Sequence, residues 1–415
     1  MNVAGNRGLW ENQQPVRRAS LLKKEFSAAR VANVQRLSLA AVIALAAILS
    51  AHAAATKDRV YIGTYTDHGS QGIYVCEFDP SNGALTPPEL AAATVDPSFL
   101  AVSPDRHFLY AINETDHFNG RPTGGVSAFS IAPATGKLTL LNQVSSLAAG
   151  PAYITVDRSG HFVLVANYDE GSVAVYRIQP DGRIGDSTAF VRHYGSSVNP
   201  DRQKGPHAHS IAMSPDNRFA IVADLGLDEL LVYPFDAAQG TLGSPRVIKA
   251  DAGVGPRHLT LASSGKFVYV INEMKSSLTV YSYNASDGSM APLQNISTLP
   301  TSFHGENTAA EVVLGASEKF LYASNRGDDN SIAVFSVDQA KGTLALVEFV
   351  PTGGKTPRNF SIDPSGRWLV AANQDSNNIV TFRINPETGR LTPAGKPVEV
   401  NSPTILDFVP LDGDK

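Results

Sequence analysis

Residues 99–114 read FLAVSPDRHFLYAINE, and this stretch decides the fold because five later stretches of the chain superimpose on it without gaps. Each copy has alternating apolar residues, a polar turn of the type Ser-Pro-Asp or Ser-Gly, and a second β-rich run that ends in Asn or Asp. Alternation with a period of two on both sides of a polar turn predicts a β-hairpin. The other copies are residues 153–168, 210–225, 258–273, 311–326 and 359–374.

Each hairpin is followed by two further short β-rich runs, for example SIAVFSV and GTLALV after residues 311–326. Four antiparallel strands make one blade of a β-propeller. The residues that end the hairpins recur 48 to 57 residues apart, which is the size of a blade. Because they are nearly invariant among the copies, we interpret their side chains as caps of a backbone turn. They are Asn113, Asn167, Asp224, Asn272, Asn325 and Asn373.

A seventh blade is divided between the two ends of the chain. Residues 59–66 and 72–79 supply a second and a third strand with no first strand before them, and residues 403–409, PTILDFV, form a lone strand. We therefore predict an all-β fold, a seven-bladed propeller of four-stranded antiparallel blades in which the C-terminal strand joins the N-terminal blade. Such closure removes two exposed sheet edges. No segment has helical periodicity after residue 53, so residues 54–415 are expected to form a single domain.

The N-terminal part of the chain has a different composition. Residues 1–36 carry seven Lys or Arg and two Glu, and residues 37–50 form an uncharged run, LSLAAVIALAAILS, before Ala51-His52-Ala53. A run of 14 residues is too short to span a bilayer, and the small residues after it fit a signal-peptidase site. We interpret residues 1–53 as a cleaved export signal and predict a periplasmic or secreted protein without stable membrane insertion. An uncleaved membrane anchor is the alternative.

Charge and cysteine content limit the partners that the protein can bind and the bonds that can stabilise it. Without residues 1–53 the chain has 27 Lys and Arg against 37 Asp and Glu, a net charge of −10, which argues against a nucleic-acid partner. The single cysteine, Cys76, cannot form an internal disulfide or a thiol-based metal cluster. We therefore expect a monomer that is stabilised by ring closure and whose partner is a small molecule.

Two positions of the repeat vary in side chain and carry charge. In an antiparallel hairpin the start of the first strand and the end of the second lie at the same edge, so both positions converge on one mouth of the propeller. The position after the terminal Asn or Asp reads Glu114, Tyr168, Leu225, Glu273, Arg326 and Gln374, with Tyr65 in the divided blade. The position that opens the first strand reads Ser98, Ala152, His209, Arg257, Ala310 and Arg358.

We expect His209, Arg257, Glu273, Arg326 and Arg358 to be neighbours at this mouth, with His258 and Glu311 one step along their strands. Arginine forks bind carboxylate or phosphate oxygens and stabilise an oxyanion, while His or Glu moves a proton near neutral pH. The pattern therefore favours an acid–base site for an anionic or carbonyl substrate. The alternative is a rim of solvated surface ion pairs.

His207 and His209 have the His-x-His spacing of a zinc site. No third ligand of similar clarity accompanies them, so we expect no metal. The apolar register places His209 in the strand-opening position, while His207 lies two residues earlier and faces the site equally well.

The segments GPHAHSIAMSPDNRFAIVADL, GPRHL, GENTAAEV and LYASNRGDDNSIAVF resemble the seven-bladed propeller lactonase family, which includes propeller-type 6-phosphogluconolactonases and fungal carboxymuconate-cyclizing enzymes. The resemblance covers about residues 58–410. It implies ester chemistry on lactones without a metal or other cofactor. In the cyclizing branch a histidine, two arginines and a glutamate are implicated, and they would fall on His209, Arg257, Arg326 and Glu273.

These considerations predict a lactonase for a sugar or organic-acid lactone. His209 would activate water, Arg257 and Arg326 would stabilise the oxyanion, and Glu273 would orient or move a proton. Substrate contacts are expected from Arg358, His207, His258 and Glu311, with Arg358 on an anionic group. A phosphorylated sugar lactone is a cytoplasmic metabolite, so the export signal argues against it as the substrate. A non-phosphorylated aldonolactone or another organic-acid lactone is expected at least equally. A lactone-forming cyclase and a non-catalytic binding propeller are the alternatives.

Overall fold

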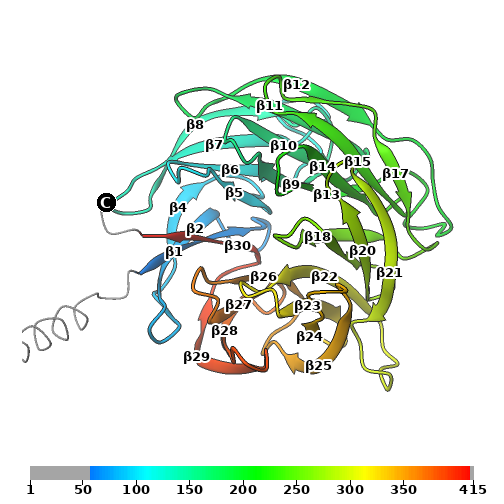
Figure 1. The fold of residues 1–415 in the computed structure, drawn as a ribbon. Coiled ribbons are helices and arrows are strands. Elements are labelled where there is room, and N and C mark those ends of the chain that lie inside the picture. Colours follow the sequence, from blue (N-terminus) through cyan, green and yellow to red (C-terminus); the bar gives the residue numbers. More distant parts are fainter. Residues whose placement is uncertain (1–56, 412–415) are drawn as a thin grey trace, which may run out of the picture. The chain divides into compact units, whose positions relative to one another are not determined.

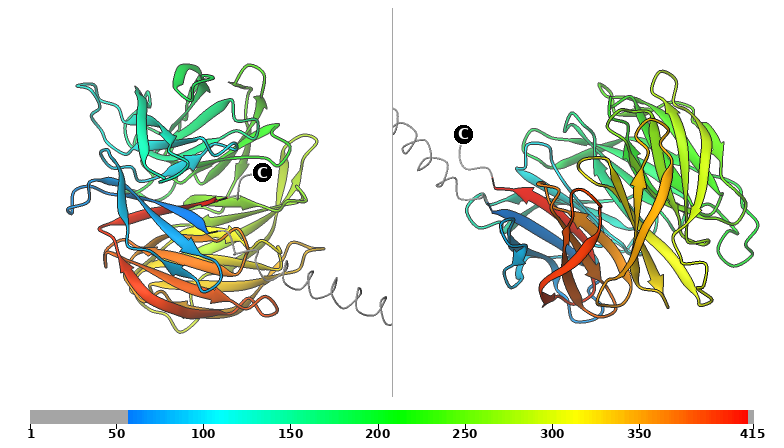
Figure 2. Two further views of the ribbon diagram at one scale, coloured as in Figure 1. Left: turned by 90° about the vertical axis from the view of Figure 1, so that its left-hand side faces the viewer. Right: turned by 60° about the horizontal axis from the view of Figure 1, so that its bottom comes forward.

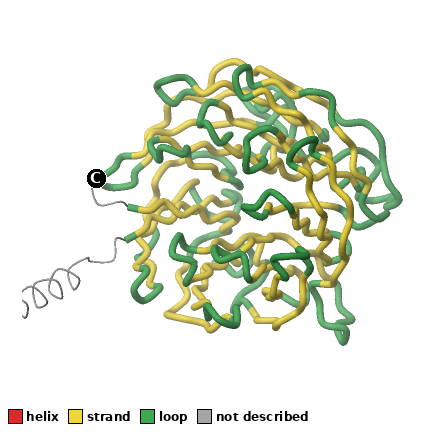
Figure 3. Tube along the Cα trace, in the orientation of Figure 1, coloured by secondary structure: helices red, strands yellow, loops and turns green. Residues whose placement is uncertain are grey.

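The computed structural model describes residues 57–411, so the predicted export signal, residues 1–53, lies outside the described residues. Thirty β-strands in this range form seven antiparallel sheets. The sheets follow one another around a ring (Figures 1 and 2), and turns and loops connect them (Figure 3). None of the described residues lies in a helix that is long and apolar enough to cross a membrane. The predicted seven-bladed propeller is confirmed.

Each sheet is one blade, and its strands follow in order from the ring centre outward. The innermost strands are β30 (Pro403–Pro410), β5 (Leu100–Val102), β9 (Pro151–Val156), β13 (Ala208–Met213), β18 (Pro256–Leu261), β22 (Asn307–Leu314) and β26 (Pro357–Ile362). The second strands are β1 (Asp58–Thr64), β6 (Phe108–Asn113), β10 (Phe162–Asn167), β14 (Phe219–Asp224), β19 (Phe267–Asn272), β23 (Phe320–Gly327) and β27 (Trp368–Asn373).

The outer half of each blade is more exposed, and in two blades the outermost strand is interrupted. The third strands are β2 (Gly72–Asp79), β7 (Gly125–Ile131), β11 (Ser172–Ile178), β15 (Glu229–Asp236), β20 (Ser277–Asn284), β24 (Ser331–Val337) and β28 (Asn378–Ile384). The outermost strands are β3 (Ala84–Leu85) with β4 (Glu89–Ala93), β8 (Leu138–Ser145), β12 (Ile184–Arg192), β16 (Thr241–Leu242) with β17 (Arg246–Lys249), β21 (Ser289–Ser297), β25 (Leu344–Pro351) and β29 (Leu391–Glu399).

The C-terminal strand closes the ring. β30 pairs antiparallel with β1, from Asp58 opposite Pro410 to Gly63 opposite Ile405, and the two strands lie side by side in Figures 1 and 2. The predicted completion of the N-terminal blade is therefore confirmed. Gly63 allows the close approach of the chain here, because a Cβ atom at this position would lie 2.2 Å from the Pro97 carbonyl oxygen.

The core lies between neighbouring blades. Every residue of β10 is buried, and its alternate side chains enter two different interfaces: Phe162 and Leu164 pack toward β13, while Val163 and Val165 pack toward the preceding blade. A strand with both faces covered reads as a continuous apolar run. This explains why the second run of each repeat is more hydrophobic than the first.

Some of the residues predicted to cap a turn donate to a backbone carbonyl oxygen of the loop before their hairpin, whereas Asn272 donates to the Ser277 and Thr279 hydroxyl groups. The side-chain amide of Asn167 donates to the Ser146 carbonyl at 3.1 Å, and that of Asn325 donates to the Thr298 carbonyl at 2.6 Å. The side chain of Asp224 has no N–H to donate, and its Oδ1 accepts from the backbone N–H groups of His207 and Leu227. His193 Nδ1 lies 2.6 Å from Asp224 Oδ2. Asp224, the one acidic residue at this position of the repeat, is thus paired with a histidine.

Candidate functional site

A β-bulge at the start of the innermost strands positions the site. Pro256 pairs with Asn272 and His258 with Ile271, so Arg257 is the extra residue of the strand. The same irregularity leaves out His209 in β13 and Arg358 in β26. A bulge leaves one residue without a ladder partner and changes the direction of its side chain. The strand-opening position predicted from the sequence is thus the bulged position of these blades.

Glu273 is the centre of the charged cluster. It follows β19 and is 5% exposed. Its Oε2 accepts from Arg257 Nε at 3.0 Å and from Arg326 Nη2 at 3.0 Å. Its Oε1 accepts from Arg202 Nη2 at 2.7 Å. Burial would raise the pKa of Glu273, but the surrounding arginines outweigh it and hold that pKa well below its ordinary value, so the carboxylate is ionised.

His209 lies beside this carboxylate with a free ring nitrogen. Its Nε2 is 3.9 Å from Glu273 Oε2, and its buried Nδ1 has no hydrogen-bond partner among the described residues. The rings of Tyr168 and His258 meet it edge to face, with centroids 5.3 and 5.1 Å away. Burial, followed by the charge of Arg257, lowers the pKa of His209 well below 6.5. A neutral imidazole in this position can accept a proton.

His258 and Glu311 form a second pair. Arg257 Nη1 donates to His258 Nε2 at 3.2 Å, which leaves the ring proton of His258 on Nδ1, and this proton points at Glu311 Oε2 at 3.1 Å. Asn359 Nδ2 also donates to Glu311 Oε2, at 2.5 Å. Burial raises the pKa of Glu311 to about 7 and, with Arg257, lowers that of His258 well below 6.5.

Arg358 and His207 lie at the edges of this cluster. Arg358 Nη2 is 4.0 Å from Glu114 Oε1, and the Arg358 guanidinium stands over the Tyr65 ring, 5.2 Å from its centroid. His207 stacks on Tyr168 with ring centroids 4.4 Å apart, and its Nδ1 lies 2.9 Å from the Tyr168 carbonyl oxygen. His207 therefore reaches His209 through Tyr168, while Arg358 lies against Glu114 and Tyr65.

Arg202 is the contact that sequence reasoning missed. It lies in the connection between β12 and β13, outside the repeat, and its Nη2 also donates to the Tyr168 hydroxyl at 3.0 Å. The length of the repeat could have indicated this loop, because the interval from Asn167 to Asp224 is the longest between two hairpins. An insertion above a predicted site is a frequent source of functional residues.

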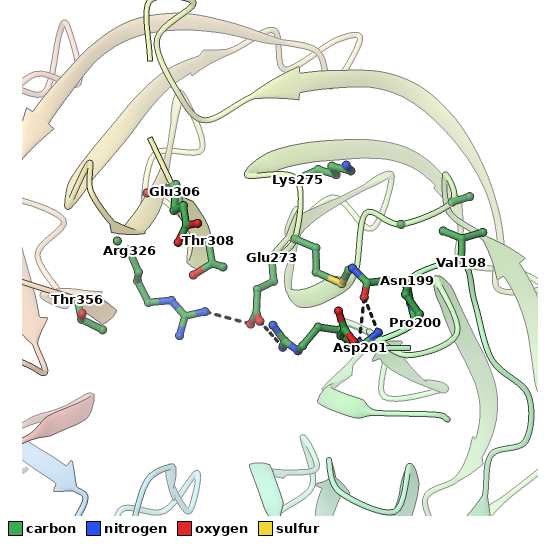
Figure 4. Close-up of a pocket in the computed structure, with 16 residues that line it drawn as sticks. Val198, Asn199, Pro200, Asp201, Glu273, Lys275, Glu306, Thr308, Arg326 and Thr356 are labelled. Atoms are coloured by element: carbon green, nitrogen blue, oxygen red, sulfur yellow. Dashed lines mark hydrogen bonds and ion pairs between the residues drawn. The ribbon is translucent and has the colours of Figure 1, made fainter. Parts of the chain in front are cut away.

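A cleft of about 1210 Å³ opens beside the cluster. Glu273, Arg202 and Arg326 line it together with residues 198–201 and Lys275, and Figure 4 shows Arg326 pointing at Glu273 across it. Among residues 57–411, no group of three or more His, Cys, Asp or Glu side chains is placed to hold a metal ion. The cleft can admit a small molecule to the Glu273 carboxylate and to the guanidinium groups of Arg202 and Arg326, while His209 and Arg257 lie behind this lining.

Comparison with known proteins identifies the family. The model described as "Lactonase, 7-bladed beta-propeller" matches residues 59–408. This chain belongs to the seven-bladed β-propeller lactonase family. The lactonase-family chain is 36% identical to 6-phosphogluconolactonase of Bacillus subtilis over 354 residues, which cover 85% of this chain and 99% of the relative. It is 34% identical to the Formosa agariphila 6-phosphogluconolactonase, with 84% of this chain and 99% of that one covered.

Solved structures give the same family. The Pseudomonas aeruginosa periplasmic gluconolactonase PpgL superimposes on this lactonase-family chain with a TM-score of 0.81 and 34% identity, covering 86% of this chain and 100% of PpgL. A putative 6-phosphogluconolactonase from Bacteroides fragilis gives a TM-score of 0.79 at 32% identity, covering 86% and 99% of the two chains.

Proposed function

We propose that this protein hydrolyses a sugar or organic-acid lactone at the Glu273 cluster. The observation that carries the proposal is the buried, neutral His209, whose Nδ1 has no partner among the described residues, beside two arginines fixed on one carboxylate. Ester hydrolysis requires a general base and preorganised cationic hydrogen-bond donors in a site that is shielded from bulk water. The relatives named 6-phosphogluconolactonase and gluconolactonase support the substrate class.

The reaction follows from these positions. His209 takes a proton from a water molecule as the water oxygen bonds to the lactone carbonyl carbon. The carbonyl oxygen becomes an oxyanion, which Arg257 and Arg326 stabilise with N–H groups that Glu273 holds in place. The bond from this carbon to the ring oxygen then breaks. The imidazolium of His209 returns its proton to the ring oxygen, and the product is an open-chain hydroxy acid.

The remaining predicted residues surround this reaction. His258 and Glu311 fix the far side of the Arg257 guanidinium, His207 supports Tyr168, and Arg358 adds positive charge at the edge of the cluster. We propose that the protein acts as an exported monomer without a cofactor. The relative PpgL, which is described as periplasmic, supports export.

Proton release tests the proposal directly. The purified protein is added to glucono-δ-lactone, or to its 6-phosphate, in a pH-stat, and the rate is compared with spontaneous hydrolysis and with the His209→Gln variant. We expect release well above the spontaneous rate with at least one lactone and near that rate with the variant. If the protein adds nothing with either lactone, the proposed hydrolysis of sugar lactones is wrong, and a binding propeller becomes the better reading.

A further inference from the structure

Arg202 differs from the other arginines that hold Glu273. Its side chain is 42% exposed, whereas those of Arg257 and Arg326 are 2% and 12% exposed. It also comes from a connecting loop and lines the cleft, while Arg257 belongs to a bulged strand of the ring. Of the three, Arg202 has the most exposed side chain and is therefore the most accessible to a molecule that enters the cleft.

The loop that carries Arg202 is firmly built. Asn199 Oδ1 accepts from the backbone N–H groups of Asp201 and Arg202, both at 3.0 Å, and the Gln203 N–H donates to the Asn199 carbonyl at 3.0 Å. Gln203 is fully buried, and its Nε2 donates to the Leu225 carbonyl at 2.8 Å. The backbone is thus held in a compact turn while the guanidinium reaches into the cleft.

The pair between Arg202 and Glu273 is the easiest of the three to exchange. Glu273 Oε2 keeps Arg257 and Arg326 when Oε1 loses Arg202, so the carboxylate stays paired. Water screens the pair with Arg202 more than the other two pairs, because the Arg202 side chain is 42% exposed although that of Glu273 is 6% exposed. A phosphate or carboxylate accepts two parallel hydrogen bonds from one guanidinium. An anionic group in the cleft therefore competes well for Arg202.

We propose that Arg202 selects lactones with a second, anionic group by exchanging its ion pair with Glu273 for one with the substrate. This inference rests on the lactone hydrolysis proposed above.

Equilibrium binding tests the exchange independently of turnover. Calorimetry of the purified protein measures the affinity for 6-phosphogluconate and for gluconate, which differ in the phosphate group. We expect the protein to bind 6-phosphogluconate at least about tenfold more tightly, the scale of one good charge-assisted contact. Arg202→Ala should reduce this preference to about twofold or less. Lys204→Ala, which removes the same charge from an exposed position of the same loop, should keep it.

Three results would overturn the inference: no preference for 6-phosphogluconate in the parent protein, an unchanged preference in Arg202→Ala, or loss of the preference in Arg358→Ala alone. The first would show that the cleft does not select a second anion. Failure of the proposed function looks different, because the preference would then depend on Arg202 while the pH-stat shows no hydrolysis. Melting temperatures of all variants show that the fold is retained.

Discussion

Arg257 Nε and Glu273 Oε2 lie 3.0 Å apart in a place where neither side chain is more than 6% exposed. The Arg257 guanidinium has two further fixed partners, because its Nη1 donates to the Ala310 carbonyl at 2.6 Å and to His258 Nε2 at 3.2 Å. Its orientation is therefore set before any substrate binds. A preorganised cation stabilises developing negative charge without the cost of reorienting solvent.

Replacing Arg257 should remove this stabilisation. We expect Arg257→Ala to lower kcat by on the order of a hundredfold or more, as loss of an oxyanion donor does, and to reduce stability by about 3–5 kcal/mol because a buried ion pair is broken. Arg257→Lys keeps the charge but loses the fork, so it should lower kcat with a smaller loss of stability. Steady-state kinetics and urea unfolding measure both. Parental kcat in Arg257→Ala would exclude a role in the transition state.

The pH dependence of kcat/KM should report His209. A general base acts only when it is neutral, so activity falls as pH decreases through its pKa. Because burial and Arg257 lower the pKa of His209, we expect the acid limb of the profile below pH 6.5. His209→Ala should remove both this limb and most of the activity. An acid limb that persists in the residual activity of His209→Ala would assign it to another group.

Glu311 should make stability fall as pH rises. Burial raises its pKa from 4.5 in the unfolded chain to about 7, so between these values the folded state keeps a proton that the unfolded state has lost. The contribution is present below about pH 4.5 and is lost by about pH 7, and it amounts to roughly 3 kcal/mol. Urea unfolding of the parent and Glu311→Gln at pH 5 and 7.5 should show the parent losing stability relative to the variant. If the difference in unfolding free energy between the parent and Glu311→Gln is the same at both pH values, the pKa of Glu311 is not raised.

Ring closure should dominate thermal stability. Removing residues 404–415 exposes the edge of β1 and deletes Ile405, Leu406 and Val409, which are 1–6% exposed and contribute about 1.5–3 kcal/mol each. We expect a large fall in melting temperature by calorimetry. Leu406→Ala, which keeps the strand, should cost only about 2–5 kcal/mol. An unchanged melting temperature in the truncated chain would mean that β30 does not hold the ring closed.

Export can be tested by the position of the mature N-terminus. The apolar run before Ala51-His52-Ala53 predicts a first residue near Ala54 in the exported fraction. Mass spectrometry of periplasmic and cytoplasmic fractions measures it. Recovery of the full-length chain from the cytoplasm would contradict the signal and would favour a phosphorylated substrate.

Much of the site could be predicted because the repeat supplies its own control. Positions such as Asn167 and Asn325 recur and cap the chain, whereas the variable charged positions at the same edge include His209, Arg257 and Glu273. The contact between Arg257 and His258 could not be predicted. Regular alternation places consecutive side chains on opposite faces of a strand, and only the bulge lets this pair meet.

Arg202 shows a different limit of the sequence. It lies in no repeat, and its partner Glu273 is 71 residues away in the chain. The alternation of residues along the strands does not relate Arg202 to Glu273. Their contact depends on where the loop between β12 and β13 lies relative to the blade that carries Glu273. Its neighbour Gln203 is buried for the same reason.

The sequence by itself determined the number of blades, the closure of the ring by its last strand and the edge at which charged residues gather. These follow from local alternation and from a repeat whose strands can be satisfied only by their neighbours. The tertiary structure decided which charges meet: three arginines on Glu273, His258 with Glu311, and Arg358 with Glu114. Bulges and loops of different blades set these pairs, and their geometry exists only once the ring is closed.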